Sequence, residues 1–260
     1  MSLEGRGAVI TGGGRGIGAA VARSLAERGA RVVVAARSAG EIEAVATALR
    51  SGGIDAWACR VDVSDPESIS DLFSQARGHL GEIDILVNNA GIATAAPVAR
   101  LELEDWNRLL SVNATGTFLC TQAVLGGMVE RGWGRIVNVA SVAGLRGASY
   151  IAGYSASKHA VLGFTRSVAA EVARDGVTVN AVCPGYVDTP MTDGSIANIV
   201  SKTGKSAEEA LEAILATTPQ RRLITAQEVA AAAVFLCDEE ARGINGQTIV
   251  LDGGAIGGLR

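Results

Sequence analysis

Cysteine, aromatic residues and long apolar runs are all scarce in this sequence of 260 residues. The four cysteines (Cys59, Cys120, Cys183 and Cys237) lie far apart without a CxxC pair, which suits neither a zinc site nor a disulfide framework. We therefore expect buried free thiols and no metal site. Uninterrupted apolar stretches such as 229–237 are much shorter than the ~20 residues of a membrane span, and the N-terminal residues lack a signal-peptide apolar region. The sequence predicts a soluble, cytoplasmic protein without membrane association.

A strong excess of one charge is also missing. The chain carries 23 basic and 27 acidic residues, a net charge of −4, and no basic block, so nucleic acid is not an expected partner. Hydrophobic residues make up 48% of the chain, which is enough for a substantial core. Glycine is abundant, with 33 residues but no Gly-X-Y period, so the glycines are expected at turns and close backbone approaches.

Short β-branched runs alternate with longer helical stretches along the chain, without a linker or repeat. The expected strands are 8–10, 31–35, 56–61, 83–87, 135–139, 178–182 and 248–251, and the expected helices are 16–28, 41–50, 66–80, 104–130, 154–173 and 226–236. This alternation predicts an α/β fold, a single doubly wound parallel sheet of the Rossmann type with helices on both faces. Residues 190–223, between the sixth strand and the last helix, are long for a loop and typical of a lid. We expect one domain over residues 1–260.

A glycine-rich segment, Thr11-Gly12-Gly13-Gly14-Arg15-Gly16-Ile17-Gly18, follows the first strand and opens the first helix. A pyrophosphate needs close backbone approach here, and the helix N-terminus supplies unpaired N–H groups. An ordinary glycine-rich turn is the alternative, but the position between strand and helix favours nucleotide binding.

The end of the second strand indicates which nicotinamide nucleotide is bound. An acid there would accept the ribose hydroxyls and repel a 2′-phosphate, but the chain reads Ala35-Ala36-Arg37-Ser38. Arg37 and Arg15 could clamp the phosphate with their planar forks of donors. NADP(H) is therefore preferred and NAD(H) remains possible. Asp62 could contact the adenine or, equally, cap the turn before Asp65.

Tyrosine and lysine are rare enough for their spacing to be informative. Lysine occurs only at Lys158, Lys202 and Lys205, and of the three tyrosines only Tyr154 has a lysine four residues later, on the same helix face. Chance would give such a pair with a probability of roughly 0.03. An ammonium ~4 Å from a phenol can lower the phenol pKa by about three units, so Tyr154 is expected to exchange protons near neutral pH. A tyrosine beside a surface lysine is the plain alternative.

Two further polar residues are candidates for the same site. Ser141 follows the fifth strand at the edge where ligands bind such sheets, and its hydroxyl could polarise a substrate oxygen or simply cap a turn. Asn113 is a poor helix former within an expected helix, so it either faces solvent or holds a water that passes protons.

At these residues the chain resembles the short-chain dehydrogenase/reductase family. The resemblance covers residues 5–254 and rests on the motifs Thr11-Gly12-xxx-Gly16-Ile17-Gly18, Asp62-Val63, Asn88-Asn89-Ala90-Gly91, Asn113, Ser141, Tyr154-xxx-Lys158 and Pro184-Gly185. It implies a catalytic tetrad with Tyr154 as acid–base, Ser141 as the oxygen-polarising group, Lys158 also on the nicotinamide ribose, and Asn113 holding a relay water. It also implies homotetramers paired through the helices that hold Asn113 and Tyr154.

The cofactor-binding residues expected from the motifs and the resemblance together form one set. They are Gly12, Gly14, Arg15, Gly16, Ile17, Gly18, Arg37, Ser38, Asp62, Val63, Asn89, Ala90, Gly91, Tyr154, Lys158, Pro184, Gly185, Val187 and Thr189. Asn88 to Gly91 could instead stabilise the strand ends.

The substrate is predicted only by class. The pocket candidates around 93–96, 142–146, Ile151 and Tyr186 are mostly small or apolar, which suits a ketone or secondary alcohol with an alkyl, acyl or aryl arm. The chain is most similar to 3-oxoacyl-thioester reductases and 3-hydroxyacyl dehydrogenases of the family. We expect an NADP(H)-dependent ketoreductase; the alternatives are an NAD(H)-dependent secondary-alcohol or 3-hydroxyacyl dehydrogenase and a non-catalytic nucleotide sensor.

Overall fold

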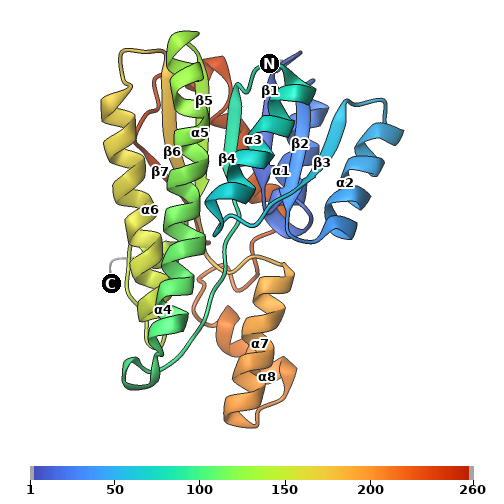
Figure 1. Cartoon of the computed structure of the whole chain (residues 1–260). Coiled ribbons are helices and arrows are strands. Elements are labelled where there is room, and N and C mark those ends of the chain that lie inside the picture. The colour runs from blue at the N-terminus through green and yellow to red at the C-terminus, as the bar shows by residue number, and fades with distance from the viewer. Residues whose placement is uncertain (1–2, 258–260) are drawn as a thin grey trace.

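Seven parallel strands form one sheet in a computed structural model that describes residues 3–257 (Figure 1). The strand order is β3-β2-β1-β4-β5-β6-β7, with β1 Gly7–Thr11, β2 Arg31–Ala36, β3 Ala56–Arg60, β4 Ile85–Asn88, β5 Gly134–Val139, β6 Val177–Pro184 and β7 Thr248–Leu251. All pairings are parallel, and the order reverses direction between β1 and β4. The predicted doubly wound α/β fold is confirmed.

The four central strands have largely apolar sequences, without the alternation of a half-exposed strand, because both of their faces are buried. Every residue of β1, β4, β5 and β6 is buried, because helices cover both faces of a doubly wound sheet. Each face has its own apolar cluster, so the helical layers are held mainly by burial of Val, Ile, Leu and Ala side chains.

The helices divide into two layers. One face carries α1 Gly16–Glu27, α2 Ala39–Ser51 and α9 Ala226–Phe235, whereas the other carries α3 Pro66–Leu80, α4 Leu103–Leu110, α5 Gly116–Glu130 and α6 Ala152–Glu171. Short 3₁₀ turns lie at Val98–Arg100, Val142–Gly144 and Glu239–Ala241. The start of α3 follows its prediction, with Pro66 in the first turn and Asp65 accepting a hydrogen bond from the Glu67 N–H at 3.0 Å.

The helix predicted over 104–130 is interrupted, which corrects the sequence-based expectation. A π-helical turn, Ser111–Thr115, separates α4 from α5 and contains Asn113. The Thr117 hydroxyl donates to the Asn113 carbonyl at 2.8 Å, and the Asn113 side chain bonds to other elements. Side chains that compete for backbone groups loosen the regular ladder, and π turns of this kind are frequent at functional sites.

By length and composition alone, the stretch Leu103–Glu130 would be apolar enough to cross a membrane. In the structure this stretch packs against α3, α6 and the sheet, as part of the helical layer on that face.

The segment predicted as a lid contains two helices. They are α7 Pro190–Thr203 and α8 Ala207–Leu215, which project beyond the main body at the carboxyl ends of the strands (Figure 1). Gly204 ends α7 in the left-handed conformation with φ 72°, and a capping box between Ser206 and Glu209 starts α8. The helix-ending Gly204 and the helix-capping Ser206 lie two residues apart, so the segment forms two short helices in place of the expected loop.

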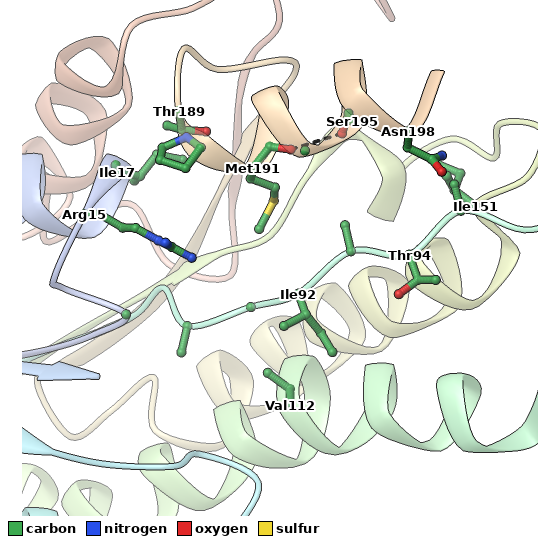
Figure 2. A pocket seen from close by; sticks show the side chains of 18 of the residues that line it. Arg15, Ile17, Ile92, Thr94, Val112, Ile151, Thr189, Met191, Ser195 and Asn198 are labelled. Atoms are coloured by element: carbon green, nitrogen blue, oxygen red, sulfur yellow. Dashed lines mark hydrogen bonds between the residues drawn. The ribbon is translucent and has the colours of Figure 1, made fainter. Parts of the chain in front are cut away.

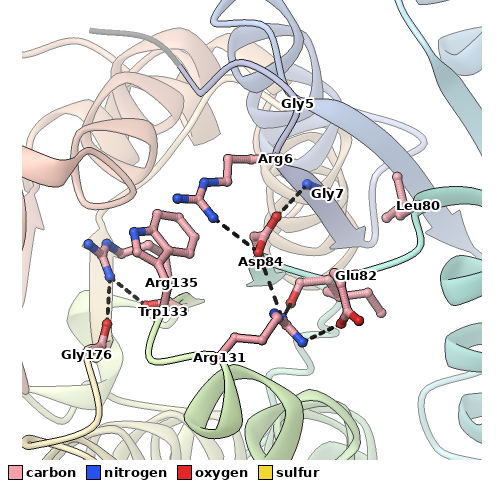
Figure 3. A network of polar contacts seen from close by, with 12 residues as sticks. Gly5, Arg6, Gly7, Leu80, Glu82, Asp84, Arg131, Trp133, Arg135 and Gly176 are labelled. Carbon is pink, nitrogen blue, oxygen red and sulfur yellow. Dashed lines mark hydrogen bonds and ion pairs between the residues drawn. The ribbon is translucent and has the colours of Figure 1, made fainter.

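The amino-terminal edge of the sheet is fixed by a polar network (Figure 3). The Trp133 ring lies between the guanidinium groups of Arg6, 3.7 Å from the ring centroid, and Arg135, 4.4 Å away. Asp84 pairs with Arg6 at 3.4 Å, and the buried Arg135 pairs with Glu239 at 3.0 Å. These contacts link the starts of β1, β4 and β5, at the opposite edge from the predicted site.

The four cysteines are free and buried, as predicted. Burial raises the pKa of Cys120 and of Cys237 to about 12 and that of Cys183 to about 11, so these thiols are protonated at neutral pH.

Candidate active site

A cavity of about 1410 Å³ runs along the carboxyl edge of the sheet, at the reversal point between β1 and β4. Open α/β sheets bind ligands at such a point. Thirteen of the predicted cofactor residues line it: Gly12, Gly14, Arg15, Gly16, Ile17, Arg37, Ser38, Asp62, Val63, Asn89, Ala90, Gly91 and Thr189. The structure therefore brings together residues from separate sequence motifs.

The turn between β1 and α1 forms one wall of the cavity, and its glycines lie against the β4 loop. Gly12 has φ 64°, and a Cβ there would lie 2.8 Å from the Asn89 amide nitrogen. A Cβ on Gly18, which supports the turn without lining the cavity, would lie 2.3 Å from the Gly12 carbonyl oxygen. Only glycine allows this contact between the two loops.

Asn89 holds the same two loops together. Its amide donates to the carbonyls of Thr11 at 3.0 Å and Gly12 at 2.9 Å, while the Thr11 hydroxyl accepts from the N–H groups of Asn89 and Ala90, each at 3.1 Å. Asn89 thus has the structural role that the sequence left open, although it also borders the cavity.

The cradle fits the pyrophosphate of a dinucleotide. Gly12, Gly14 and Gly16 line it, and a Cβ on each would press on Asn89, Glu41 and Thr189 respectively, so glycine keeps the backbone of the turn packed closely and open to the cavity. The first residue before α1, Arg15, makes no side-chain cap hydrogen bond, and the first-turn N–H groups of α1 therefore remain available for an anion.

The end of the cavity beside β2 and α2, where the sequence predicts the adenosine, combines two arginines with two carboxylates. Arg15, Arg37 and Ser38 line it, together with Asp62 and Glu41. Glu41 was missed by the sequence analysis because it lies within α2, and its carboxylate pairs with Arg15 at 3.2 Å.

Asp62 has the turn-capping role that the sequence offered as one of two possibilities. Its Oδ1 accepts from the Ser64 hydroxyl at 2.6 Å and from the Ser64 N–H at 3.0 Å. These bonds, with a smaller contribution from the Arg37 charge, lower the pKa of Asp62. It is therefore an anionic wall of the cavity as well as a turn residue.

The tyrosine, serine and lysine of the predicted tetrad lie near one another, and the lysine lies behind Gly91 of the cavity wall. α6 carries Tyr154 and Lys158 in its first two turns, and the Lys158 ammonium lies 5.8 Å from the centroid of the Tyr154 ring. The Ser141 hydroxyl, just after β5, lies close enough to the Tyr154 phenol to lower its pKa. A Cβ on Gly91 would lie 3.5 Å from the Lys158 ammonium, so a glycine separates the lysine from the cavity.

The protonation of the pair differs from the expected lowering of the phenol pKa. Burial raises the pKa of Tyr154, and the hydrogen bond with Ser141 opposes that rise. Burial also lowers the pKa of Lys158 to about 8, and its ammonium donates to the Val139 carbonyl at 2.9 Å. Loss of water on burial is the largest influence on the phenol pKa, and the Lys158 charge does not produce the lowering that the sequence led us to expect.

Asn113 connects three parts of the site. Its Oδ1 accepts from the Ile92 N–H, and its Nδ2 donates to the Ile92 carbonyl and to the Ser157 hydroxyl, all at 2.9 Å. Ser157 in turn donates to the Tyr154 carbonyl at 2.7 Å. Both amide protons are thus used, and a relay water held by Asn113 would have to bind one of its oxygens.

Six predicted cofactor residues do not line the cavity: Gly18, Tyr154 and Lys158, described above, and Pro184, Gly185 and Val187 at and after the end of β6. The Gly185 N–H donates to the Leu251 carbonyl at 2.9 Å, directly after Pro184 at the end of β6. The Val187 carbonyl accepts from the Thr192 hydroxyl at 2.5 Å. These residues anchor the base of the lid.

The far end of the cavity is formed by the lid and the loop after β4. Figure 2 shows Met191 and Asn198 of α7 on one side, and Ile92 and Thr94 on the other. Tyr150 borders this end with a strained φ of 70°, and its carbonyl accepts from the Ala96 N–H at 2.7 Å. The surface is mixed, with apolar groups next to amide and hydroxyl groups.

In the part of the chain that the structure describes, no cluster of three or more His, Cys, Asp or Glu residues could hold a metal ion.

Comparison with known proteins identifies the family. The family model described as short chain dehydrogenase matches residues 6–200. The chain is 38% identical to the 3-oxoacyl-acyl-carrier-protein reductase FabG of Escherichia coli (strain K12) and 41% identical to FabG of Vibrio cholerae, over 98% of this chain and 98% of each relative. A crystal structure of a tryptophan variant of actinorhodin polyketide ketoreductase with NADPH superposes with a TM-score of 0.94 at 39% identity, covering 98% of this chain and 99% of that one.

Proposed function

The chain belongs to the short-chain dehydrogenase family of oxidoreductases, and we propose that it is an NADPH-dependent ketoreductase that acts on a 3-oxoacyl thioester or a related ketone. The proposal places catalysis on Asn113, Ser141, Tyr154 and Lys158, with residues 190–223 as the substrate lid.

One observation carries this proposal. The Tyr154 phenol, the Ser141 hydroxyl and the Lys158 ammonium meet at one point of the carboxyl edge, next to the wall of the nucleotide-sized cavity. Burying the Lys158 ammonium costs folding free energy. A purely structural role for the tyrosine and the lysine would not account for that cost, whereas catalysis would.

The roles of the side chains follow from their protonation and partners. The nicotinamide, when bound, supplies hydride to the substrate carbon. Tyr154 then donates its proton to the carbonyl oxygen, while the Ser141 hydroxyl stabilises the charge that develops on that oxygen. Lys158 would hold the nicotinamide ribose from behind Gly91 and would keep a positive charge near the phenol as the proton leaves. Asn113 positions α6 through Ser157.

The pKa of Tyr154 favours reduction at neutral pH. Because burial raises this pKa, the phenol is protonated and ready to donate when a ketone is reduced. Alcohol oxidation requires the phenolate, so its rate should increase with pH while the rate of reduction should not.

NADPH rather than NADH is proposed from the charges at the adenosine end. Arg15 and Arg37 line the cavity there, and the end of β2 has Ala35 and Ala36 where an acid would repel the 2′-phosphate. The actinorhodin polyketide ketoreductase, whose structure contains NADPH, supports this assignment by its similarity.

The substrate class is supported by the far end of the cavity and by the relatives. Apolar groups such as Ile92, Ile151 and Met191 suit the acyl chain or ring of a ketone, and both FabG relatives described above are named as 3-oxoacyl reductases.

The test follows NADPH absorbance with acetoacetyl thioesters, cyclic ketones and aryl ketones as substrates. Tyr154→Phe removes the transferable proton and should lower kcat by roughly 10²–10⁴, while NADPH still binds in a fluorescence titration. Turnover at the wild-type rate in this variant would exclude the mechanism. Absence of NADPH consumption with every ketone, despite tight nucleotide binding, would favour the non-catalytic sensor.

We also propose that the enzyme is a homotetramer that pairs through α5 and α6. Phe118 on α5 is 41% exposed and makes an edge contact with Phe164 on α6, at 6.1 Å between ring centroids. Gly163 leaves open space on the outer side of α6, so a second copy could approach closely there.

A further inference from the structure

Glu41 is a carboxylate in the wall of the cavity at the adenosine end. It occupies the third position of α2, where a glutamate commonly closes a capping box. Ser38, at the N-cap, makes no side-chain cap hydrogen bond, and the Glu41 carboxylate instead pairs with Arg15, 26 residues earlier.

The backbone fixes the position of this carboxylate. Gly14 packs directly on α2, since a Cβ on Gly14 would lie 2.8 Å from the Cβ of Glu41 and 3.3 Å from the Ile42 nitrogen. The glycine turn and the start of α2 are therefore in contact. This contact places the Glu41 side chain alongside the turn that carries Arg15.

The ion pair affects any anion that Arg15 would bind. The Arg15 guanidinium is 3.2 Å from the Glu41 carboxylate, and a phosphate oxygen on the same guanidinium would sit at ~2.8 Å. The two anions would then be within about 7 Å of each other. The 5′-phosphates would be held by the N–H groups of the turn and of α1, so the repulsion would fall mainly on the 2′-phosphate.

We infer that Glu41 selects against the adenosine 2′-phosphate and so reduces the preference for NADP(H) over NAD(H) that Arg15 and Arg37 create. This inference rests on the proposed function, because it assumes that the nucleotide lies in this cavity with its 2′-phosphate at Arg15.

The size of the effect follows from the distance. A phosphate of charge about −2 at about 7 Å from a carboxylate in water is disfavoured roughly sevenfold, and physiological salt lowers this to roughly two- to threefold. Partial burial of Glu41, whose side chain is 38% exposed, weakens the screening. Removing the charge should therefore tighten 2′-phosphate binding about three- to tenfold.

Asp62 is the other carboxylate of this wall among the described residues, and its bonds to Ser64 distinguish it from Glu41. Both of those bonds hold the Asp62 oxygen within its own turn, whereas the Glu41 carboxylate binds the very arginine that a 2′-phosphate needs.

The test compares two ligands and two variants by isothermal titration calorimetry. Adenosine 2′,5′-bisphosphate carries the 2′-phosphate and 5′-AMP does not. Glu41→Gln should bind the bisphosphate about three- to tenfold more tightly than wild type, with 5′-AMP affinity changed less than about twofold. Glu43→Gln is the matched control: Glu43 lies on the same helix, pairs with Arg50 and does not line the cavity, so both affinities should stay at the wild-type value.

Each other outcome has a definite meaning. Unchanged or weaker bisphosphate binding in Glu41→Gln would overturn the inference, as would an equal gain in Glu43→Gln or for 5′-AMP. Should wild type bind neither ligand nor NADPH, the proposed function itself fails together with the inference. The gain should also shrink at about 0.5 M salt, because the effect is electrostatic.

Discussion

Replacing Lys158 by Met should make the stability difference between variant and wild type depend on pH. Lys158 is 5% exposed, and burial lowers its pKa from 10.5 to about 8. A shift of this size corresponds to about 3 kcal/mol of folding free energy lost at pH 7. Methionine has a similar length and no charge, so Lys158→Met removes that loss while it abolishes the function of the ammonium.

The sign follows from proton binding. Between pH 8 and 10.5 the unfolded chain holds the Lys158 proton and the folded chain does not, so the stability of wild type rises with pH relative to the variant. From about pH 7 to 9.5 the advantage of the variant should fall by about 2 kcal/mol. The lost hydrogen bond to the Val139 carbonyl costs about 1 kcal/mol, but it adds a nearly constant offset and does not change this trend.

Urea unfolding of both proteins at about pH 7, 8 and 9.5, at one protein concentration, measures the difference. Other titrating groups are common to both proteins and cancel. Lys205→Met, at an exposed position of the lid, is the control: it measures how removing a lysine charge that is not buried changes the free energy of unfolding over the same pH range. A difference between Lys158→Met and wild type that stays constant over this pH range would refute the idea that a buried ammonium opposes folding here.

Four further substitutions test other parts of the site and fold. Gly18→Ala should lower stability by more than about 2 kcal/mol and weaken NADPH binding, because its Cβ would lie 2.3 Å from the Gly12 carbonyl oxygen; thermal unfolding and a binding titration measure both. Asn113→Ala leaves the Ile92 backbone groups without their partner and should cost about 1–3 kcal/mol, along with at least tenfold in kcat; wild-type stability would contradict it. Arg37→Asp should shift the ratio of kcat/KM values for NADPH and NADH at least tenfold toward NADH, and an unchanged ratio would show that Arg37 does not contact the 2′-phosphate. Phe118→Glu should dissociate the proposed tetramer in light-scattering measurements, and an unchanged mass would exclude α5 from the interface.

The order of strands and helices and the location of the site could be predicted because they follow from local patterns. The periodicity of apolar residues marks the elements, and right-handed crossovers then restrict the topology. The glycines around Gly12 and the Tyr154–Lys158 spacing identify the chemistry, since both motifs are short and contiguous. The residues that the motifs specify could therefore be named from the sequence, and their catalytic and cofactor-binding roles stay predictions.

The features that the sequence analysis missed depend on contacts between distant segments. The π turn at Asn113 accompanies the bonds of one amide to Ile92 and Ser157, which no helix propensity encodes. Glu41 meets Arg15 only because α2 packs on the glycine turn. The raised pKa of Tyr154 reflects the whole surrounding protein, whereas the sequence offered only the neighbouring lysine charge.

Buried polar groups are concentrated at the carboxyl edge of the sheet, and their bonds explain how the site keeps its geometry. The Asn88 amide donates to Asn138 at 2.9 Å, and Asn138 donates to the Thr165 hydroxyl at 2.9 Å, so the ends of β4 and β5 are linked to each other and to α6. Asn113 then ties the loop after β4 to the same helix. Each of these groups would be costly without its partner, so a displacement of α6, which carries the phenol and the ammonium, breaks several buried bonds at once. The phenol and the ammonium that we propose as catalytic groups are thereby held in place by hydrogen bonds from the strand ends and the loop after β4.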